Sequence, residues 1–297
     1  MIKRFFIATS FCLSSLALAV NALQVIDDTG KKISLDRPAQ RIVSLAPHVT
    51  ELLFAAGAGD AVVGVVSYSD YPPEAGQRPQ VGDAQNLDVE SIVTLQPDLV
   101  VAWQSGNPTP QLEQLIRFGI PVFYSEPRRL EDIATNLERL GHLAGRDESA
   151  SAAAENFRAG TRRLHEHYSR AAPVRVFYEI WHQPLMTIGG KHLISQLISA
   201  CGGQNIFADL DALAAAVDSE AVLTANPEVI IASGISKQRP PWLDQWLDWP
   251  QLYAVKRKQL YFIPPDLIQR HTPRLLEGAQ RLCGQLQQAR VARKQNP

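Results

Sequence analysis

The sequence predicts an α/β protein with two parallel-sheet lobes, a single long rigid helix that joins them, and a ligand cleft between the lobes. Short β-branched runs alternate with helical patterns in both halves of the chain, which is typical of parallel sheets covered by helices. A stretch without strand signal, residues 147–170, separates the halves. The halves also repeat one order of helix, proline and strand, which indicates a duplicated lobe.

The first lobe opens with a β-α-β unit. Residues 41–45 (RIVSL) and 61–67 (AVVGVVS) are rich in β-branched residues and predict two strands. Between them, residues 48–56 (HVTELLFAA) predict a helix that stops at Gly57. Because a helix connects the two strands, they are expected to lie parallel.

A capped helix and a buried strand continue the first lobe. Asp88 is a suitable N-cap for a helix that runs to residue 96, and Pro97 prevents that helix from continuing. Residues 98–103 (DLVVAW) are almost all apolar, as expected of a parallel strand covered on both faces. The remaining predicted elements are a helix at 111–118, a strand at 120–124 and an amphipathic helix at 130–144.

The linking segment and the second lobe follow. Residues 147–170 would form one helix about 36 Å long, and Pro173 ends it. The alternation then resumes with strands at 174–180 and 228–232 and helices at 193–200 and 220–225. The predicted organisation is a signal peptide at 1–22, a first lobe at 23–146, a linking helix at 147–172 and a second lobe at 173–297.

Two segments of the predicted lobes match each other. Seven positions separate Glu90 from Pro97, and seven separate Glu220 from Pro227. The same offset of 130 positions therefore relates both pairs. Chance similarity between two generic α/β units is the alternative, but a duplicated lobe is the better interpretation.

The composition and the first residues bear on partners and location. The chain has 29 Lys and Arg against 30 Asp and Glu, so it has no basic excess for nucleic acid. Lys3 and Arg4 precede an apolar stretch at 5–20, and small residues precede a cleavage point after Ala22. We therefore expect a cleavable secretory signal. A retained membrane anchor is the weaker alternative, because the apolar stretch is short for a bilayer.

Removal of the signal leaves two cysteines, Cys201 and Cys283. An even pair in an exported chain favours one disulfide bond. Two buried free thiols remain the alternative, since spacing in the sequence does not give the separation of the Cα atoms.

Aromatic residues, rather than catalytic motifs, follow the predicted strands. The chain contains no G-x-S-x-G, P-loop or H-E-x-x-H motif, so we expect a binding protein and not an enzyme. Tyr68, Trp103, Tyr178 and Trp181 end or follow strands. Such rings suit a broad, partly apolar ligand, although each one singly could be packed in a core.

Four segments carry a resemblance to a known family. They are RIVSLAPHVTELLFAAGAG, GVVSYSDYPPEA, ESIVTLQPDLVVAW and ISACGGQNIF, and the resemblance extends over the whole mature chain. These segments resemble the periplasmic cobalamin receptors of bacterial ABC importers, within the class whose two lobes are joined by a helix. The resemblance implies a monomer in the periplasm that carries cobalamin or a related corrinoid, without covalent chemistry, to the permease dimer of an ABC transporter.

The resemblance also implies roles for single residues. Tyr68 and Trp103 match aromatic positions that contact the corrin, while Asp266 and Arg270 match a polar pair near the edge of the ligand. Cys201 and Cys283 match the disulfide of the family. Glu90 and Glu220, the pair related by the internal repeat, match two carboxylates that dock on arginines of the permease.

Several positions depart from the family pattern. Ala84, Ala214 and Leu267 stand where the family has tryptophans, so part of the aromatic cage is missing. Trp181 lies one position from a family ring position and is expected to replace some of it. His48 stands where the family has a small residue at the pocket floor.

His48 leaves the nature of the ligand open. It could hydrogen-bond a corrin side chain or act as an axial ligand of cobalt or of a haem iron, and it could equally be a helix residue without a ligand role. A haem or ferric-siderophore receptor of the same class is therefore the nearest alternative to a cobalamin receptor. An α/β enzyme acting on a tetrapyrrole is a more distant alternative, because it would need a base near the cleft.

Overall fold

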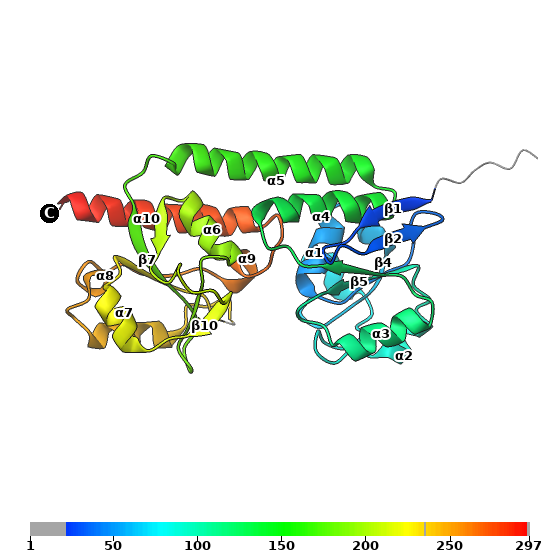
Figure 1. Ribbon diagram of the computed structural model, residues 1–297, viewed down its shortest axis with the longest axis horizontal. Coiled ribbons are helices and arrows are strands. Elements are labelled where there is room, and N and C mark those ends of the chain that lie inside the picture. Colours follow the sequence, from blue (N-terminus) through cyan, green and yellow to red (C-terminus); the bar gives the residue numbers. More distant parts are fainter. Residues whose placement is uncertain (1–21, 235, 296–297) are drawn as a thin grey trace, which may run out of the picture.

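The computed structural model describes residues 22–234 and 236–295 and has two lobes below one long helix (Figure 1). The predicted secretory signal at 1–22 lies outside the described residues except for Ala22. In the described part of the chain, no helix is both long and apolar enough to cross a membrane.

The first lobe is built on a parallel sheet of four strands in the order β4-β3-β5-β6. Its strands are β3 (Ile42–Ser44), β4 (Val62–Val65), β5 (Leu99–Trp103) and β6 (Val122–Ser125). Its helices are α1 (Pro47–Ala55), α2 (Val89–Thr94), α3 (Thr109–Arg117) and α4 (Leu130–Leu143), with 3-10 turns η1 (Gly59–Ala61) and η2 (Pro73–Gln77). All the helices and strands predicted for this lobe are confirmed, to within a few residues at their ends.

The second lobe has a mixed sheet of six strands. Its strands β7 (Val174–Trp181), β9 (Gly203–Asn205), β11 (Val229–Ala232) and β12 (Leu260–Phe262) run parallel. Strand β8 (Met186–Ile188) pairs antiparallel with β7, and β10 (Ala214–Ala216) pairs antiparallel with β8. Its helices are α6 (Leu193–Ala200), α7 (Ser219–Ala225), η3 (Pro241–Asp248), α8 (Tyr253–Lys256), α9 (Pro265–Ile268) and α10 (Leu275–Gln295). The two strands predicted for this lobe, β7 and β11, are parallel as expected. The antiparallel pairs that β8 makes with β7 and with β10 lie at one edge of the sheet and are not part of the prediction.

A two-stranded hairpin completes the first lobe. Strands β1 (Leu23–Ile26) and β2 (Lys32–Leu35) pair antiparallel. The Asp28 carboxylate then accepts hydrogen bonds from Arg139 and Asn136 of α4. These bonds attach the start of the described chain to the lobe.

The long helix α5 (Asp147–Tyr168) passes over both lobes and packs on α4 and α10 (Figure 1). Two glycines make these contacts close. A Cβ at Gly141 of α4 would overlap Ala150 of α5, and a Cβ at Gly160 of α5 would overlap Leu276 of α10. The linking helix is therefore held against both lobes rather than standing free between them.

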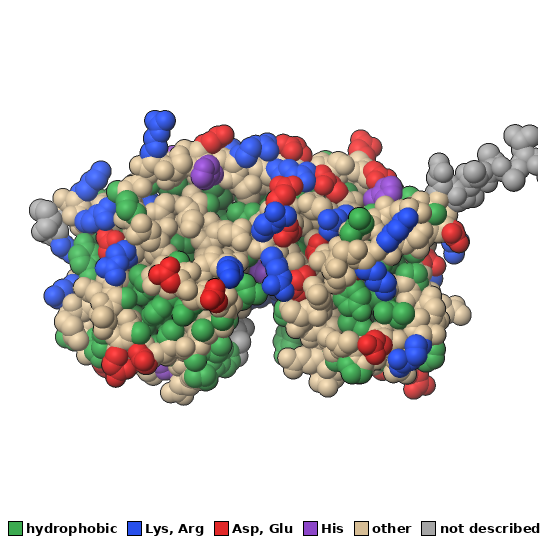
Figure 2. Space-filling view, viewed as in Figure 1, with side chains coloured by type: hydrophobic (Ala, Val, Ile, Leu, Met, Phe, Trp, Pro, Cys, Tyr) green, Lys and Arg blue, Asp and Glu red, His purple; other side chains and the backbone are tan. Residues whose placement is uncertain are grey.

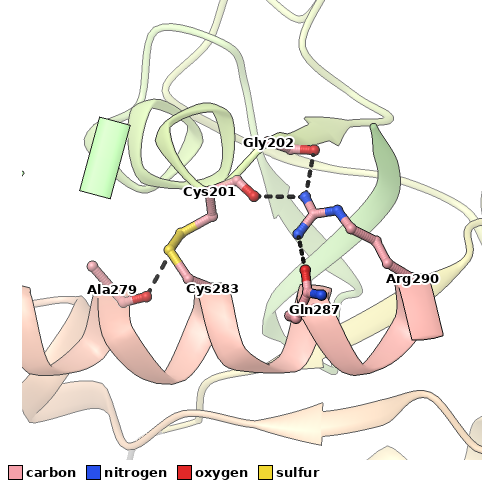
Figure 3. The surroundings of a disulfide bond; sticks show 6 residues. All are labelled: Cys201, Gly202, Ala279, Cys283, Gln287 and Arg290. Carbon is pink, nitrogen blue, oxygen red and sulfur yellow. Dashed lines mark hydrogen bonds between the residues drawn. A yellow bond between two sulfur atoms is a disulfide. The ribbon is translucent and has the colours of Figure 1, made fainter. Parts of the chain in front are cut away.

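A disulfide bond connects α6 to α10 in the second lobe (Figure 3). Cys201, which follows α6, is bonded to Cys283 of α10, so the alternative of two free thiols is wrong. The Arg290 guanidinium donates to the carbonyl oxygens of Cys201 at 2.7 Å and Gly202 at 3.0 Å. The C-terminal helix is therefore attached to the loop after α6 by one covalent link and by an arginine.

We expect thiol titration of the denatured, unreduced mature protein to detect no free thiol, because both remaining cysteines are in the disulfide. The same protein after reduction should show two thiols and provides the control. Two reactive thiols before reduction would contradict the bond.

Candidate functional site

The hollow between the lobes is the candidate ligand site. Figure 2 shows the surface recessed between the lobes, on the side away from α5. The loop after β4 meets residues that follow α9 across this junction, where the Arg270 guanidinium donates to the carbonyl oxygen of Tyr68 at 3.1 Å. Segments that follow strands of both sheets therefore meet where the two lobes join.

A buried carboxylate joins the lobes at this junction. Glu51 of α1 is only 3% exposed and accepts hydrogen bonds from Arg270 at 2.8 Å, Thr272 at 3.0 Å and Arg274 at 3.0 Å through both of its oxygens. Arg270 also donates to Asp70 of the first lobe at 2.8 Å. We call Glu51, Asp70, Arg270, Thr272 and Arg274 the interlobe clasp.

The structure separates the predicted polar pair. Arg270 faces the first lobe in the interlobe clasp, whereas an Asp266 oxygen lies 3.4 Å from Arg274 and 3.8 Å from Lys237. The other Asp266 oxygen is buried and has no hydrogen-bond partner among the described residues. Asp266 and Arg270 thus lie in one network but are not bonded to each other.

Trp103 and His48 lie together on the first-lobe side. Their ring centroids are 5.5 Å apart in an edge-to-face arrangement, which is a favourable aromatic geometry. Gly106 lies against the Trp103 ring, where any Cβ would overlap it. Asn107 accepts from the Trp103 backbone N–H and donates to the Leu45 carbonyl oxygen. The turn after β5 therefore fixes the orientation of this indole.

His48 is an uncharged, enclosed imidazole. It is 9% exposed, and its Nε2 is buried and has no hydrogen-bond partner in the described part of the chain. Burial, with His271 and Arg270 nearby, lowers its pKa to about 3. In this conformation Nε2 is closed off from a ligand in the hollow.

Burial of His48 should make the protein less stable in acid. The pKa of His48 is about 3 in the folded protein and 6.5 in the unfolded chain. Between these pH values the imidazole is protonated only in the unfolded chain, and this protonation favours unfolding. The free energy of unfolding therefore decreases as the pH falls below 6.5, and the decrease reaches about 2 kcal/mol at pH 5. Urea unfolding at pH 7 and pH 5 should show a smaller loss in His48→Gln than in the wild type. An equal loss in both would contradict this.

Three histidines cross the junction. The ring centroids of His48 and His271 are 6.4 Å apart, and those of His271 and His192 are 6.2 Å apart. Burial lowers the pKa of His271 and that of His192, the latter to about 4. Within the described residues, no group of three or more His, Cys, Asp or Glu side chains is placed to hold a metal ion.

Trp181 belongs to a cavity of about 460 Å³ that we call the second-lobe cavity. The indole is 41% exposed, and its N–H donates to the Gln183 carbonyl oxygen at 2.8 Å, so the ring offers only apolar surface. The residues around the cavity are Ile180, Trp181, Pro184, Met186, His192, Ile194 and Gln269. Trp181 is thus on the second-lobe side, separate from the pair of Trp103 and His48.

Tyr68 and Tyr178 have opposite surroundings. Tyr68 is 80% exposed, at a positive φ of 65° in the loop after β4, and its ring is free to meet a ligand. Tyr178 is fully buried in β7, so its interpretation as a lining residue is wrong. It lies on a strand face that packs into the core, whereas Trp181 lies at the strand end. Among the positions that depart from the family, Leu267 is buried and Ala214 is exposed.

Glu90 and Glu220 occupy equivalent places. Glu90 is in the first turn of α2, which Asp88 caps by accepting from the Ser91 N–H at 3.0 Å. Glu220 is in the first turn of α7, which Asp218 caps in the same way. Both glutamates are exposed, and both helices lie on the side of their lobe away from α5 (Figure 1).

The sequence does not predict the places of Glu51, Arg274, His192 and His271 at the junction of the lobes. Helical spacing could have linked Glu51 to His48, because it follows His48 by three positions in α1 and therefore lies on the same side of the helix. No local pattern pairs it with arginines more than 200 positions away.

The comparisons with known proteins agree with this architecture. The model of the periplasmic binding protein family matches residues 42–267. A vitamin B12-binding protein of Yersinia pestis (strain Pestoides F) is 42% identical over 248 residues, 84% of this chain and 86% of that protein.

Solved structures are similar as well. The periplasmic vitamin B12 binding protein BtuF of Vibrio cholerae has a TM-score of 0.77 and 38% identity, covering 85% of this chain and 98% of that one. The periplasmic heme binding protein HutB of Vibrio cholerae has a TM-score of 0.72 over 83% of this chain and 98% of that one, but at 22% identity it supports the fold alone. The family resemblance in the sequence is confirmed, and the chain belongs to the periplasmic binding protein family.

Proposed function

We propose that this protein is a periplasmic receptor that captures cobalamin or a related corrinoid and delivers it to an ABC transporter. The observation that carries the proposal is the 42% identity to a vitamin B12-binding protein over 84% of the chain. The exposed rings of Tyr68 and Trp181, one in each lobe, give two apolar surfaces suited to a broad macrocycle. Cobalamin is the cargo, and no covalent step is part of the proposal.

Each predicted ligand residue has a role in the proposed function. Tyr68, Trp103 and Trp181 supply flat contact surface. Asp266 and Arg270 supply polar contacts at the edge, for which Arg270 has to share its N–H groups with the interlobe clasp. His48 supports Trp103 and becomes available to the ligand only when its ring or the lobes move.

The proposed receptor is exported and has a membrane partner. Residues 1–22 act as a cleaved export signal, and the mature receptor acts as a monomer with lobes at 23–146 and 173–297 and a linking helix at 147–172. Glu90 and Glu220 dock on a permease dimer, one on each lobe. Their matching positions in α2 and α7 support a partner with twofold symmetry.

Calorimetric titration with cyanocobalamin, cobinamide and haemin tests the proposed function. We expect saturable binding of cyanocobalamin at one site per chain. Binding of haemin without binding of either corrinoid would contradict the proposal.

Removal of either first-lobe ring should weaken corrinoid binding. Trp103→Ala and Tyr68→Ala each delete a large flat surface, and an aromatic contact is worth about 0.5–1.5 kcal/mol beyond its area. Calorimetry with cyanocobalamin should show at least a few-fold loss in each variant. Phe118→Ala, which removes an exposed ring after α3, is the matched control and should bind as the wild type does. Unchanged affinity in both test variants would contradict the assignment.

The three histidines favour haem as the second candidate ligand. Imidazoles are common ligands of iron. The rings of His48, His271 and His192 follow one another across the junction, with neighbouring ring centroids 6.4 Å and 6.2 Å apart. A visible spectrum of the protein with haemin should then shift in the wild type and not in His48→Ala. Equal spectra in the two proteins would exclude His48 as the iron ligand.

A further inference from the structure

The second-lobe cavity combines apolar walls with two polar groups. Its apolar lining residues are Ile180, Trp181, Pro184, Met186 and Ile194. Its polar lining residues are His192 and Gln269. A few polar groups in an apolar hollow are what orients a small ligand group.

His192 offers a hydrogen-bond donor. Its Nδ1 lies 3.1 Å from the backbone nitrogen of Ile194 and accepts the hydrogen bond that caps α6. A backbone N–H can only donate, so Nδ1 carries the lone pair and the proton of the neutral ring is on Nε2. Burial and the neighbouring His271 lower the His192 pKa to about 4, so the ring is neutral at pH 7.

Gln269 offers a hydrogen-bond acceptor. Its Nε2 donates to the Ser233 carbonyl oxygen at 3.0 Å and to the Ser233 hydroxyl at 3.1 Å. The carbonyl oxygen can only accept, which fixes the orientation of the amide. In residues 22–234 and 236–295, nothing donates to the Gln269 Oε1 within hydrogen-bond distance, so this oxygen remains available to a ligand.

The cavity has no ionised side chain at neutral pH among its described lining residues. Arg270 follows Gln269 in the chain, but it is not among the residues that line this cavity, and its guanidinium points to Glu51 and Asp70 of the first lobe. A carboxylate in the cavity would lose hydration without gaining a cation, which is costly. A neutral primary carboxamide has one acceptor and two donors, which complement the His192 N–H and the Gln269 oxygen.

We propose that the second-lobe cavity is a carboxamide subsite, in which His192 Nε2–H donates to the oxygen of a ligand amide and Gln269 Oε1 accepts from its nitrogen. The inference rests on the proposed function and refines it. The subsite selects macrocycles with neutral amide arms, as corrinoids have, over macrocycles with carboxylate arms, as haem has.

A pair of substitutions at one position tests the subsite. Asparagine and aspartate are both good N-caps, so His192→Asn and His192→Asp should each keep the first turn of α6 capped. Only the asparagine retains an N–H donor for the ligand. We expect His192→Asp to bind cyanocobalamin at least 10-fold more weakly than His192→Asn, since it leaves an amide oxygen facing acceptors alone. Thermal unfolding of the two variants without ligand should coincide.

A change in the ligand gives the second arm of the test. Cobalamin monocarboxylic acids, each with one peripheral amide hydrolysed, should be titrated separately against the wild type at pH 7. At least one isomer should bind 10-fold or more weakly than cyanocobalamin. Equal affinity of His192→Asn and His192→Asp for cyanocobalamin would overturn the subsite and leave the receptor function standing. A wild-type protein that binds no corrinoid would overturn both.

Discussion

Glu51→Ala should lower the free energy of unfolding by about 3–5 kcal/mol, because it removes the anion from a buried ionic cluster. Two guanidinium groups, from Arg270 and Arg274, lie within 3.0 Å of the Glu51 oxygens and would remain without it. The side chain of Arg274 is 14% exposed, so water cannot fully replace the lost partner. Urea unfolding of the ligand-free protein measures the effect.

Two control variants show whether the loss of stability comes from the buried charge of Glu51 or follows the removal of any glutamate. Glu74→Ala removes an exposed carboxylate from η2 and should change stability by no more than about 0.5 kcal/mol. Glu51→Gln keeps the side-chain volume but not the charge, so its loss should fall between those of the two alanine variants. If Glu51→Ala proves as mild as Glu74→Ala, the interlobe clasp does not contribute to the stability of the fold.

The double variant Glu90→Arg with Glu220→Arg should abolish most uptake and leave ligand affinity unchanged. A carboxylate paired with a permease arginine contributes a charge-assisted contact, and the reversed charge would oppose that arginine. Each site should lose about 2 kcal/mol or more of the free energy of permease binding, so the double variant should bind the permease far more weakly. Both glutamates are exposed in the first turns of α2 and α7, outside the hollow, which is why the ligand should not sense the change.

Permease binding in detergent and corrinoid calorimetry together check the docking prediction. Glu148→Arg is the matched control, because Glu148 is likewise an exposed first-turn residue, but of α5 on the opposite side. The control should retain uptake. Permease binding at wild-type strength in the double variant would show that the two glutamates only interact with their helix dipoles.

The fold could be predicted where local patterns were strong. The apolar run of β5 and the Asp88 cap of α2 are properties of short stretches, and the structure agrees with both. Strand β10 is three alanines, which prefer helix, and it becomes a strand only by pairing with β8. Helix α10 contains Gly278 and Gly284, which weaken the helical pattern, and Gly278 is there because the Leu267 backbone passes against it.

The residues of the candidate site differ in the same way. The sequence predicts that Tyr68 follows one parallel strand and that Trp103 ends another, and the structure places them after β4 and at the end of β5, while their contact with a ligand stays a prediction. The clasp between Glu51 and Arg274 joins positions 223 apart and arises only when the lobes are assembled. Burial of Tyr178 could not be separated from exposure of Trp181, since both are aromatic and only three positions apart.

The close packing of α5 on α4 and α10 has a consequence for how the empty protein would interact with its transporter. Because α5 packs closely on α4 at Gly141 and on α10 at Gly160, a large change in the distance between the lobes would have to break these contacts. An empty and a loaded receptor would then present almost the same outline to the transporter. Under the proposed function, empty receptors should therefore compete with loaded ones for the transporter, and a large excess of receptor over cobalamin should slow uptake instead of accelerating it.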